Sequence, residues 1–339
     1  MTNIAGADAI VAARGGAWVR IEHLARILQV YVRPASGPLS FWYEEPEMNG
    51  AYRRDTRQYY MRFRGKAGYA GPFDGSGIPL LDYRGRIGRQ YNPIAIAQYG
   101  LARFNRWCES RADHDRTAWL AASRWLADGL QPNAHGVPVW VHHFDWPYRQ
   151  LLRAPWYSGL AQGNGLSLLV RAARETGDDI FSDAAHRAFQ SLERPVSQGG
   201  VLAIDAQGDV WIEEYIVDPP SHILNGFIWA LWGVRDYARW SGKGSAASLW
   251  DSCVDTLATR IREFDIGWWS LYEARHSGNR MLASLYYHRL HVVQLRVLHD
   301  LTGIDAFADC AERFEAYARR PLARARAFVE KAWFKARHY

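Results

Sequence analysis

The sequence predicts a mainly α-helical fold, an incomplete α/α toroid of four helix pairs with hairpin returns between them. Four apolar segments of similar sequence begin at residues 94, 158, 222 and 286, so each begins 64 residues after the previous one. After a short turn, each is followed by a segment in which charged and apolar residues alternate at helical spacing. An apolar inner helix paired with an amphipathic outer helix is the pattern that two concentric rings of helices require.

The inner helices are expected to carry glycine or alanine on the faces that pack closely. The outer helices are expected over residues 117–130, 182–192, 245–264 and 306–317. A solenoid of helix pairs would show the same alternation, but its repeats are usually about 33 to 47 residues long. The additional residues of each repeat lie in the returns that join one pair to the next.

The returns, residues 131–156, 193–220 and 265–284, each contain a hairpin-like piece. In a toroid all such returns emerge at one end of the ring, which we call the mouth. Residues at equivalent points of different repeats therefore converge there. The groups at equivalent points are residues 145–149, 211–215 and 271–276, which predict a site built from several repeats.

The first 90 residues do not show this 64-residue repeat of helix pairs. A helix is expected over residues 21–32, followed by short aromatic segments separated by glycine and proline. The sequence therefore predicts a small β-rich N-terminal cap over the mouth, residues 1–90, and a toroid domain, residues 91–339. Four pairs leave the flanks of the ring open, and residues 319–339 alternate apolar and basic side chains. We expect this tail to cover a flank, either on the same chain or in a homodimer.

Composition narrows the function. The 339 residues include 16 tryptophans and 18 tyrosines, and those in the returns suit stacking on sugar rings. The net charge of +6 comes without long basic runs, so no nucleic-acid partner is expected. The abundance of arginine over lysine suits contacts to carboxylates or sulfates of a polyanion, but a high-GC genome would produce it equally.

Cysteine usage and the N-terminus predict a cytoplasmic protein with no membrane span. The three cysteines lack metal-ligand spacing and suit a reducing compartment. Charged residues interrupt the first 30 residues, so neither a signal peptide nor a spanning helix is expected. His142 and His143 would point to opposite faces of a strand, which disfavours a metal site. No metal site is therefore expected.

Six motifs, in order, resemble those of one family. They are residues 91–101 (YNPIAIAQYGL), 155–163 (PWYSGLAQG), 211–215 (WIEEY), 224–227 (LNGF), 272–276 (YEARH) and 287–295 (YHRLHVVQL). From about residue 77 to the C-terminus the chain resembles the D-glucuronyl C5-epimerases of heparan-type polysaccharides. The resemblance implies an incomplete α/α barrel that inverts C5 of a uronic acid within a polysaccharide such as heparosan, without an organic cofactor.

The resemblance also implies site residues. The family's active-site positions correspond to Glu214, Tyr215, Tyr272, Arg275 and Tyr287. Contacts to the polysaccharide are expected from His276, His288, Asn225, Gln162, Trp156, Tyr91 and Tyr148.

The chain also departs from the family's pattern. The β-rich N-terminal portion is much reduced, and the stretch from His276 to Tyr287 is shorter. Ile216 stands where proline is usual, and Tyr286 where aspartate is common. These departures bear on substrate identity and chain length more than on the reaction.

The chemistry of C5 inversion matches these residue types. A hydrogen α to a carboxylate is a very weak acid, so the charge that forms on its removal must be neutralised. Arg275 is the natural candidate, with His276 as a second donor. Inversion also needs a proton acceptor and a proton donor on opposite faces of the sugar. Glu214 is a conventional base, and a tyrosine could serve if a nearby cation lowered its pKa.

Structural roles for these residues remain open on sequence grounds. Glu213 or Glu214 could be a solvated edge charge, Tyr272 and Tyr287 could be core tyrosines, and Arg275 could pair with Glu273 or Glu214. Two other functions also remain open. A uronan lyase would abstract the same proton and then expel O4, and a glycan-binding protein would catalyse neither reaction.

Overall fold

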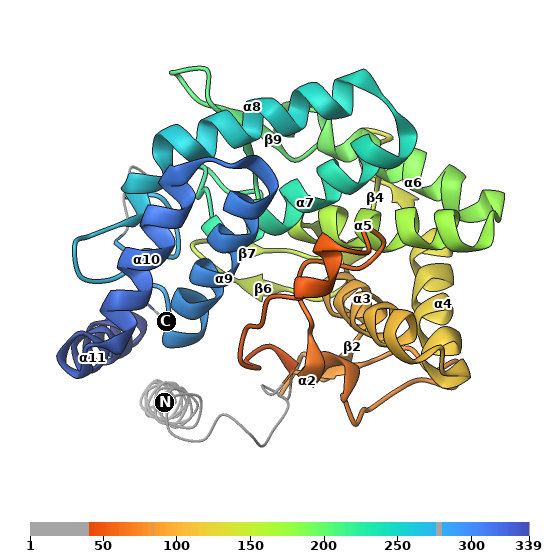
Figure 1. Ribbon diagram of the computed structural model, residues 1–339, viewed down its shortest axis with the longest axis horizontal. Helices are drawn as coiled ribbons and strands as arrows, with labels where there is room; N and C mark the ends of the chain where they lie inside the picture. Colours follow the sequence, from red (N-terminus) through yellow and green to blue (C-terminus); the bar gives the residue numbers. More distant parts are fainter. Residues whose placement is uncertain (1–40, 84, 276–279, 339) are drawn as a thin grey trace, which may run out of the picture.

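The computed structural model describes residues 41–83, 85–275 and 280–338. It confirms a mainly helical fold of four helix pairs arranged as an open ring (Figure 1). The inner helices are α3 (Pro93–Ser110), α5 (Gly159–Thr176), α7 (Leu224–Ser241) and α9 (Leu285–Thr302). The outer helices are α4 (Asp113–Asp128), α6 (Asp179–Leu192), α8 (Gly244–Arg260) and α10 (Asp305–Arg319).

Local sequence signals set the ends of the inner helices. The Asn92 side chain accepts hydrogen bonds from the first amides of α3, and Ser158 caps α5 in the same way. A residue with left-handed backbone follows each inner helix: Arg111, Gly177, Gly242 and Gly303. The outer helices begin one to four residues earlier than predicted, because each starts directly after this tight turn.

The close packing expected of the inner helices is confirmed between α5 and α7. A Cβ atom added at Gly163 would collide with the backbone of Ala230. One added at Gly233 would collide with the backbone of Gly163. The two helices therefore pack backbone to backbone, and any side chain at these glycines would push the ring apart.

Two of the three predicted hairpin returns contain paired strands. In the first return, β3 (Gln131–Pro132) pairs with β4 (Pro138–Val139), β5 (Val141–His142) with β8 (Trp156–Tyr157), and β6 (Trp146–Pro147) with β7 (Leu151–Leu152), all antiparallel. In the second return, β9 (Leu202–Ile204) pairs with β10 (Val210–Ile212).

The third return also turns back on itself, but its described residues form isolated antiparallel bridges in place of paired strands. One bridge joins Asp265 to Ser270, a second joins Leu271 to Leu282, and a third joins Glu273 to Ile223, directly before α7. The backbone of the third return is thus shared between its own two arms and the neighbouring return. This sharing brings the second and third returns together at the mouth.

The segment before the ring departs from the predicted β-rich cap. Its described elements are η2 (Gly50–Arg53), α2 (Arg64–Ala67) and the two-residue strands β1 (Leu81–Asp82) and β2 (Arg89–Gln90), and the rest is irregular. The helix predicted over residues 21–32 lies outside the described residues. Residues 49–63, which we call the inner segment, bury Tyr52, residues 58–61 and Phe63 against the inner helices, whereas residues 53, 54 and 56 are exposed.

Polar side chains of three inner helices hold the inner segment. The Tyr59 amide donates to Asn105 of α3 (2.8 Å), and the Tyr59 hydroxyl donates to Asn164 of α5 (2.9 Å). The Tyr60 hydroxyl donates to Asp236 near the end of α7 (2.7 Å). Polar side chains buried on three helices therefore fix the segment in the core.

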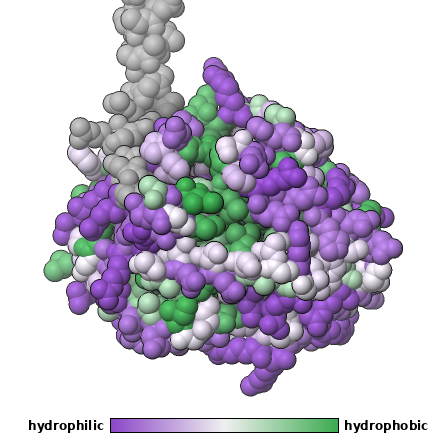
Figure 2. Space-filling model, turned by 90° about the horizontal axis from the view of Figure 1, so that it is seen from above, coloured by the Kyte–Doolittle hydropathy of each residue, from purple (hydrophilic) through white to green (hydrophobic). Residues whose placement is uncertain are grey.

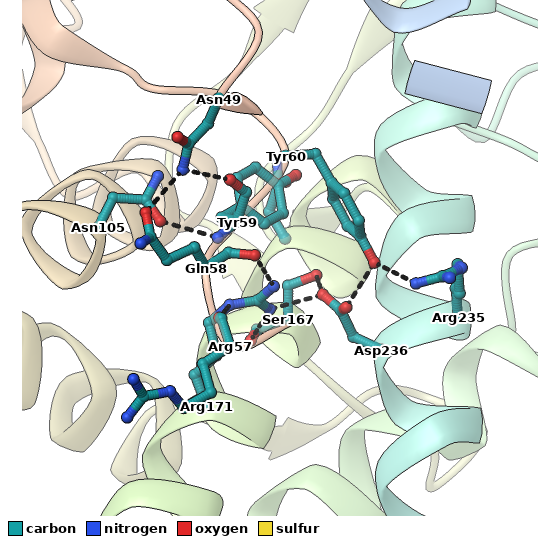
Figure 3. A network of polar contacts seen from close by, with 11 residues as sticks. Asn49, Arg57, Gln58, Tyr59, Tyr60, Asn105, Ser167, Arg171, Arg235 and Asp236 are labelled. Carbon is teal, nitrogen blue, oxygen red and sulfur yellow. Dashed lines mark hydrogen bonds and ion pairs between the residues drawn. The ribbon is translucent and has the colours of Figure 1, made fainter. Parts of the chain in front are cut away.

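A buried ion pair completes this polar network (Figure 3). The Arg171 guanidinium contacts the Asp236 carboxylate at 2.6 Å, and Ser167 donates to the same oxygen at 2.8 Å. Arg171 also donates to the backbone oxygens of Arg57 and Gln58 of the inner segment. Arg171 thus donates hydrogen bonds both to a helix side chain and to the backbone of the inner segment. Buried polar groups need such partners.

The C-terminal helix α11 (Pro321–His338) packs on the protein, one of the two expectations for the tail. Lys331 donates to the Leu282 backbone oxygen (2.6 Å), and the Arg326 guanidinium lies 4.0 Å from the centre of the Trp268 ring. Leu322, Val329 and Trp333 are exposed.

On the face seen from above, apolar side chains gather in the middle of a largely polar surface (Figure 2). None of the described helices is long and apolar enough to cross a bilayer.

Candidate active site

Four tyrosines from different segments meet around Glu214 at the mouth. Tyr215 follows β10, Tyr272 lies in the third return, Tyr287 is in the first turn of α9, and Tyr148 lies between β6 and β7. The ring centroids of Tyr148 and Tyr215 are 4.6 Å apart, and those of Tyr272 and Tyr287 are 4.9 Å apart. The structure thus brings Tyr148, Tyr215 and Tyr272, which the repeat places at equivalent points, together with Tyr287 of α9.

The Glu214 carboxyl is buried beside a glycine that makes room for it. A Cβ atom at Gly226 would overlap the Glu214 carboxyl group. Asn225, expected to contact substrate, directs its amide nitrogen at the same carboxyl, 3.4 Å away. Burial raises the pKa of Glu214 to about 8, although hydrogen bonds from Tyr215 and Tyr272 oppose the increase. Near neutral pH this carboxyl can therefore both accept and release a proton.

The tyrosines do not have the lowered pKa expected of proton acceptors. Burial and the nearby Glu214 charge raise the pKa of Tyr215, Tyr272 and Tyr287 well above the usual value. Their hydroxyls accordingly remain protonated near neutral pH. The raised pKa values favour Glu214 as the proton acceptor and the tyrosine hydroxyls as donors.

Glu213 is buried too, but it holds a loop together. Its carboxylate accepts from the backbone amides of Ser221 and His222, both at 3.1 Å, and forms a short contact with the His222 ring. Its backbone oxygen accepts from the Gly159 amide (3.0 Å) at the start of α5. Neither glutamate is a solvated edge charge, and Glu213 anchors the strand end that presents Glu214.

Arg149 is a site residue that sequence reasoning did not single out. Its guanidinium contacts the buried Glu273 carboxylate at 2.9 Å, and the Tyr148 hydroxyl donates to the same oxygen at 2.6 Å. Arg149 directly follows Tyr148 and belongs to one of the groups at equivalent points of the repeat. This position is the sequence signal that could have identified it. Glu273 pairs with Arg149, so the alternative that Arg275 serves as its structural partner is not supported.

Arg275 lies at the end of the same return and is exposed. The preceding Ala274 amide is held by the backbone oxygens of Ser221 and His222, both at 3.3 Å. His276, the predicted second donor, lies outside the described residues.

The remaining predicted contact residues divide between the mouth and the core. Trp156 is half-buried, with its ring centroid 5.8 Å from that of Tyr215. Tyr91 is 39% exposed and packs on Trp125, and its hydroxyl donates to Asp74. Both are accessible at the mouth end of the ring.

Gln162 and His288 are placed differently from the prediction. Gln162 is fully buried and bonds the backbone of Trp140. His288 is also buried, between Ser270 and the Phe314 backbone oxygen, with its ring stacked on Trp269. These side chains point into the wall because consecutive helical residues face different directions. Their predicted role in binding substrate is wrong for this structure.

No cluster of three or more histidine, cysteine, aspartate or glutamate side chains suited to a metal ion occurs among the described residues. His142 is stacked on Trp156 at 3.8 Å, and burial lowers its pKa to about 3. His143 is exposed on the opposite side of the strand. The two histidine side chains therefore point to opposite sides of the strand, as neighbouring strand residues do.

Comparison with known families identifies the chain. The family model described as D-glucuronyl C5-epimerase C-terminus matches residues 136–316, more than half of the sequence. The chain belongs to this family. The matched range includes Tyr148, Glu214, Tyr215, Tyr272, Arg275 and Tyr287, and it ends before α11.

Two relatives show how much of the chain is shared. A D-glucuronyl C5-epimerase of Caenorhabditis elegans is 28% identical over 223 residues, which is 61% of this chain and 36% of that protein. An uncharacterized protein of Methanocaldococcus jannaschii is 30% identical over 172 residues, 50% of this chain and 54% of that protein. The chain thus spans about half or less of the length of these relatives.

Similarity to solved structures is weak. The unsaturated glucuronyl hydrolase of Bacillus sp. GL1 aligns with a TM-score of 0.44 and 14% identity, over 66% of this chain and 61% of that chain. A family 76 glycoside hydrolase (mannosidase) of Bacteroides thetaiotaomicron aligns with a TM-score of 0.45 and 12% identity, over 70% and 62% of the two chains.

Proposed function

We propose that this protein inverts C5 of D-glucuronate residues within a polysaccharide, giving L-iduronate. The observation that carries the proposal is the buried Glu214 carboxyl, with its pKa raised to about 8, among tyrosine hydroxyls at the mouth. Membership of the epimerase family supports the same reaction class. Heparosan, which alternates glucuronate and N-acetylglucosamine, is the substrate we propose to test first.

In the proposed reaction, ionised Glu214 takes the proton from C5. The C–H bond breaks, and its electron pair delocalises into the substrate carboxylate. Hydroxyl groups that stay protonated stabilise this charge by donating hydrogen bonds to it. Tyr215 and Tyr272 suit this role, because their hydroxyls lie beside Glu214 and have a raised pKa. Each can turn its one hydroxyl proton to the substrate carboxylate once Glu214 has taken the C5 proton. The polysaccharide is neither cleaved nor oxidised, so the step needs no co-reactant.

A second group must return a proton to the opposite face of C5. Tyr287 suits this role, because it reaches the cluster from α9 whereas Glu214 comes from the return before α7. Ser284 caps α9 and accepts from the Tyr287 amide (3.3 Å), which fixes the position of this residue in the first turn. Glu214 then releases the proton it took to solvent, and solvent reprotonates the Tyr287 tyrosinate.

The proposal is tested by incubating heparosan and other uronans with the protein in heavy water, followed by proton NMR. Epimerisation predicts deuterium at C5 and iduronate signals without chain shortening. A lyase would release unsaturated products that absorb in the near ultraviolet. A glycan-binding protein would do neither, and absence of C5 exchange on every uronan that binds would refute the proposal.

Replacing Tyr287 with phenylalanine is expected to reduce C5 deuterium incorporation by about 10²- to 10⁴-fold, because a positioned proton donor contributes on that order. The ring and its packing on Tyr272 remain, so the melting temperature should change little. Tyr286→Phe is the matched control on the neighbouring position. Parental incorporation by both the folded Tyr287→Phe and the folded Tyr215→Phe variant would contradict the arrangement of Tyr287 on one face of the sugar and the pair Glu214 and Tyr215 on the other.

Replacing Arg275 with lysine is expected to reduce turnover by orders of magnitude while binding falls modestly. The substitution keeps the charge but removes the planar two-donor contact to the uronate carboxylate. Arg149→Lys provides the comparison, because Arg149 is already engaged by Glu273 and its loss should lower stability first. Near-parental exchange by Arg275→Lys, with a lowered melting temperature, would indicate a structural role for Arg275.

A further inference from the structure

A hollow separate from the tyrosine cluster lies at the mouth end of the ring, beside the first helix pair. It is a cleft of about 280 Å³, lined by Tyr91, Trp125, Trp140, Asp128, Gln131 and His143. The rings of Tyr91 and Trp125 have centroids 5.6 Å apart and planes inclined at 34°, so together they form an aromatic wall. A hydrogen bond from the Tyr91 hydroxyl to Asp74 (2.7 Å) fixes this wall in place.

The cleft and the tyrosine cluster are on opposite sides of the strand β5. Val141 and His143 line the cleft, whereas the intervening His142 faces the other way and stacks on Trp156 of β8. The Trp156 ring in turn lies 5.8 Å from the Tyr215 ring. The strand β5 and the stacked rings of His142 and Trp156 therefore lie between the two sites.

The lining of the cleft selects the kind of ligand. Aromatic faces stack on the apolar faces of sugar rings, and the amide, imidazole and carboxylate around them can hydrogen-bond hydroxyl groups. Its volume lies below the range of about 300 to 1,000 Å³ typical of drug-sized ligands, so it suits a single sugar. None of the described residues that line it is lysine or arginine, while Asp128 supplies a negative charge. A uronate carboxylate would meet repulsion there without a partner.

We propose that this cleft binds a neutral sugar of the same polysaccharide, at a position beyond the immediate neighbour of the reacting uronate. This inference rests on the proposed function, since it assumes a chain that alternates uronate with neutral amino sugars. The cleft would hold the polymer in register across the mouth. It would thereby favour long chains over short ones without taking part in proton transfer.

The experiment compares two substrates. One is a long heparosan chain, and the other is a trisaccharide with a single glucuronate between two N-acetylglucosamine units. C5 exchange is measured for the parental protein and for Trp125→Ala, Trp125→Phe and the control Trp333→Ala, which removes an exposed tryptophan of α11. Binding of the long chain is measured separately by calorimetry, and melting curves establish that each variant is folded.

Trp125→Ala is expected to raise the KM for the long chain about tenfold, the order of effect of one lost aromatic contact, with kcat unchanged. The KM for the trisaccharide should not change. Trp125→Phe should keep the KM for the long chain close to the parental value, and Trp333→Ala should leave it unchanged. An unchanged KM for the long chain, or an equal increase for both substrates, would overturn the proposal.

The binding measurement separates this inference from the proposed function. If the parental protein catalyses no C5 exchange, the proposed function fails. The cleft is then judged by calorimetry alone. Weaker binding of the long chain by Trp125→Ala, but not by Trp333→Ala, would still support the subsite, and equal binding by both would refute it.

Discussion

Replacing Glu214 with glutamine is expected to reduce C5 hydrogen exchange by about 10²- to 10⁴-fold, the contribution of a positioned general base. In the parental protein, exchange should increase with pH and level off above about 8, because burial raises the pKa of Glu214 to about 8 and only the ionised form accepts the proton. The glutamine variant should lose this dependence. The measurement is deuterium incorporation across pH 5 to 10 by proton NMR.

The Glu214→Gln substitution is also expected to change how the stability of the protein depends on pH. A carboxyl whose folded-state pKa is raised from 4.5 to about 8 contributes most to stability below pH 4.5, and this contribution is lost as pH rises to about 8. The glutamine variant avoids that loss, so its melting temperature should equal or exceed that of the parent at pH 8 and match it near pH 4. Glu213→Gln is the matched comparison, and it should destabilise the loop that Glu213 anchors. Parental exchange by a folded Glu214→Gln variant would exclude Glu214 as the base.

Replacing Asp236 with alanine is expected to cost about 3 to 5 kcal/mol of unfolding free energy, because it leaves the buried Arg171 guanidinium without its partner. Both side chains are at least nine-tenths buried, and their contact of 2.6 Å lies in the network that holds the inner segment. The measurement is chemical denaturation followed by circular dichroism.

The control for this prediction removes both charges. The double variant Arg171→Met, Asp236→Leu should be markedly more stable than Asp236→Ala, since no charge is left unpaired. A loss below about 1 kcal/mol for Asp236→Ala would indicate that water or another group reaches Arg171 and that the network is not closed.

The helix pairs could be predicted because their signals are local and periodic. The spacing of the apolar segments places all four inner helices, and glycines such as Gly163 mark the closest packing. The bridge between Glu273 and Ile223 could not be predicted, because these residues lie about fifty positions apart in the sequence. The inner segment was also misplaced, since its position depends on polar side chains scattered over three helices.

Part of the candidate site could also be predicted from the periodicity of the repeat. Equivalent positions in the repeats converge at the mouth, which brings Tyr148, Glu214 and Tyr272 together. A motif does not reveal which neighbour in a helix faces the cavity, so His288 was assigned to substrate although only Tyr287 faces the cluster. The protonation states also could not be predicted, because they depend on burial around Glu214 that only the assembled fold shows.

The inner segment changes how a ring of repeats can come apart. Repeats that contact only their neighbours can unfold one at a time. Here Arg53 pairs with Asp300 at the end of α9, whereas Tyr59 bonds α3 and α5 and Tyr60 bonds α7. One stretch of chain therefore connects all four inner helices, including the first and last, which do not meet as neighbours in a closed ring. Opening any single pair would expose buried tyrosines and charges from the others, so the toroid should behave as one cooperative unit and not as a series of separable modules.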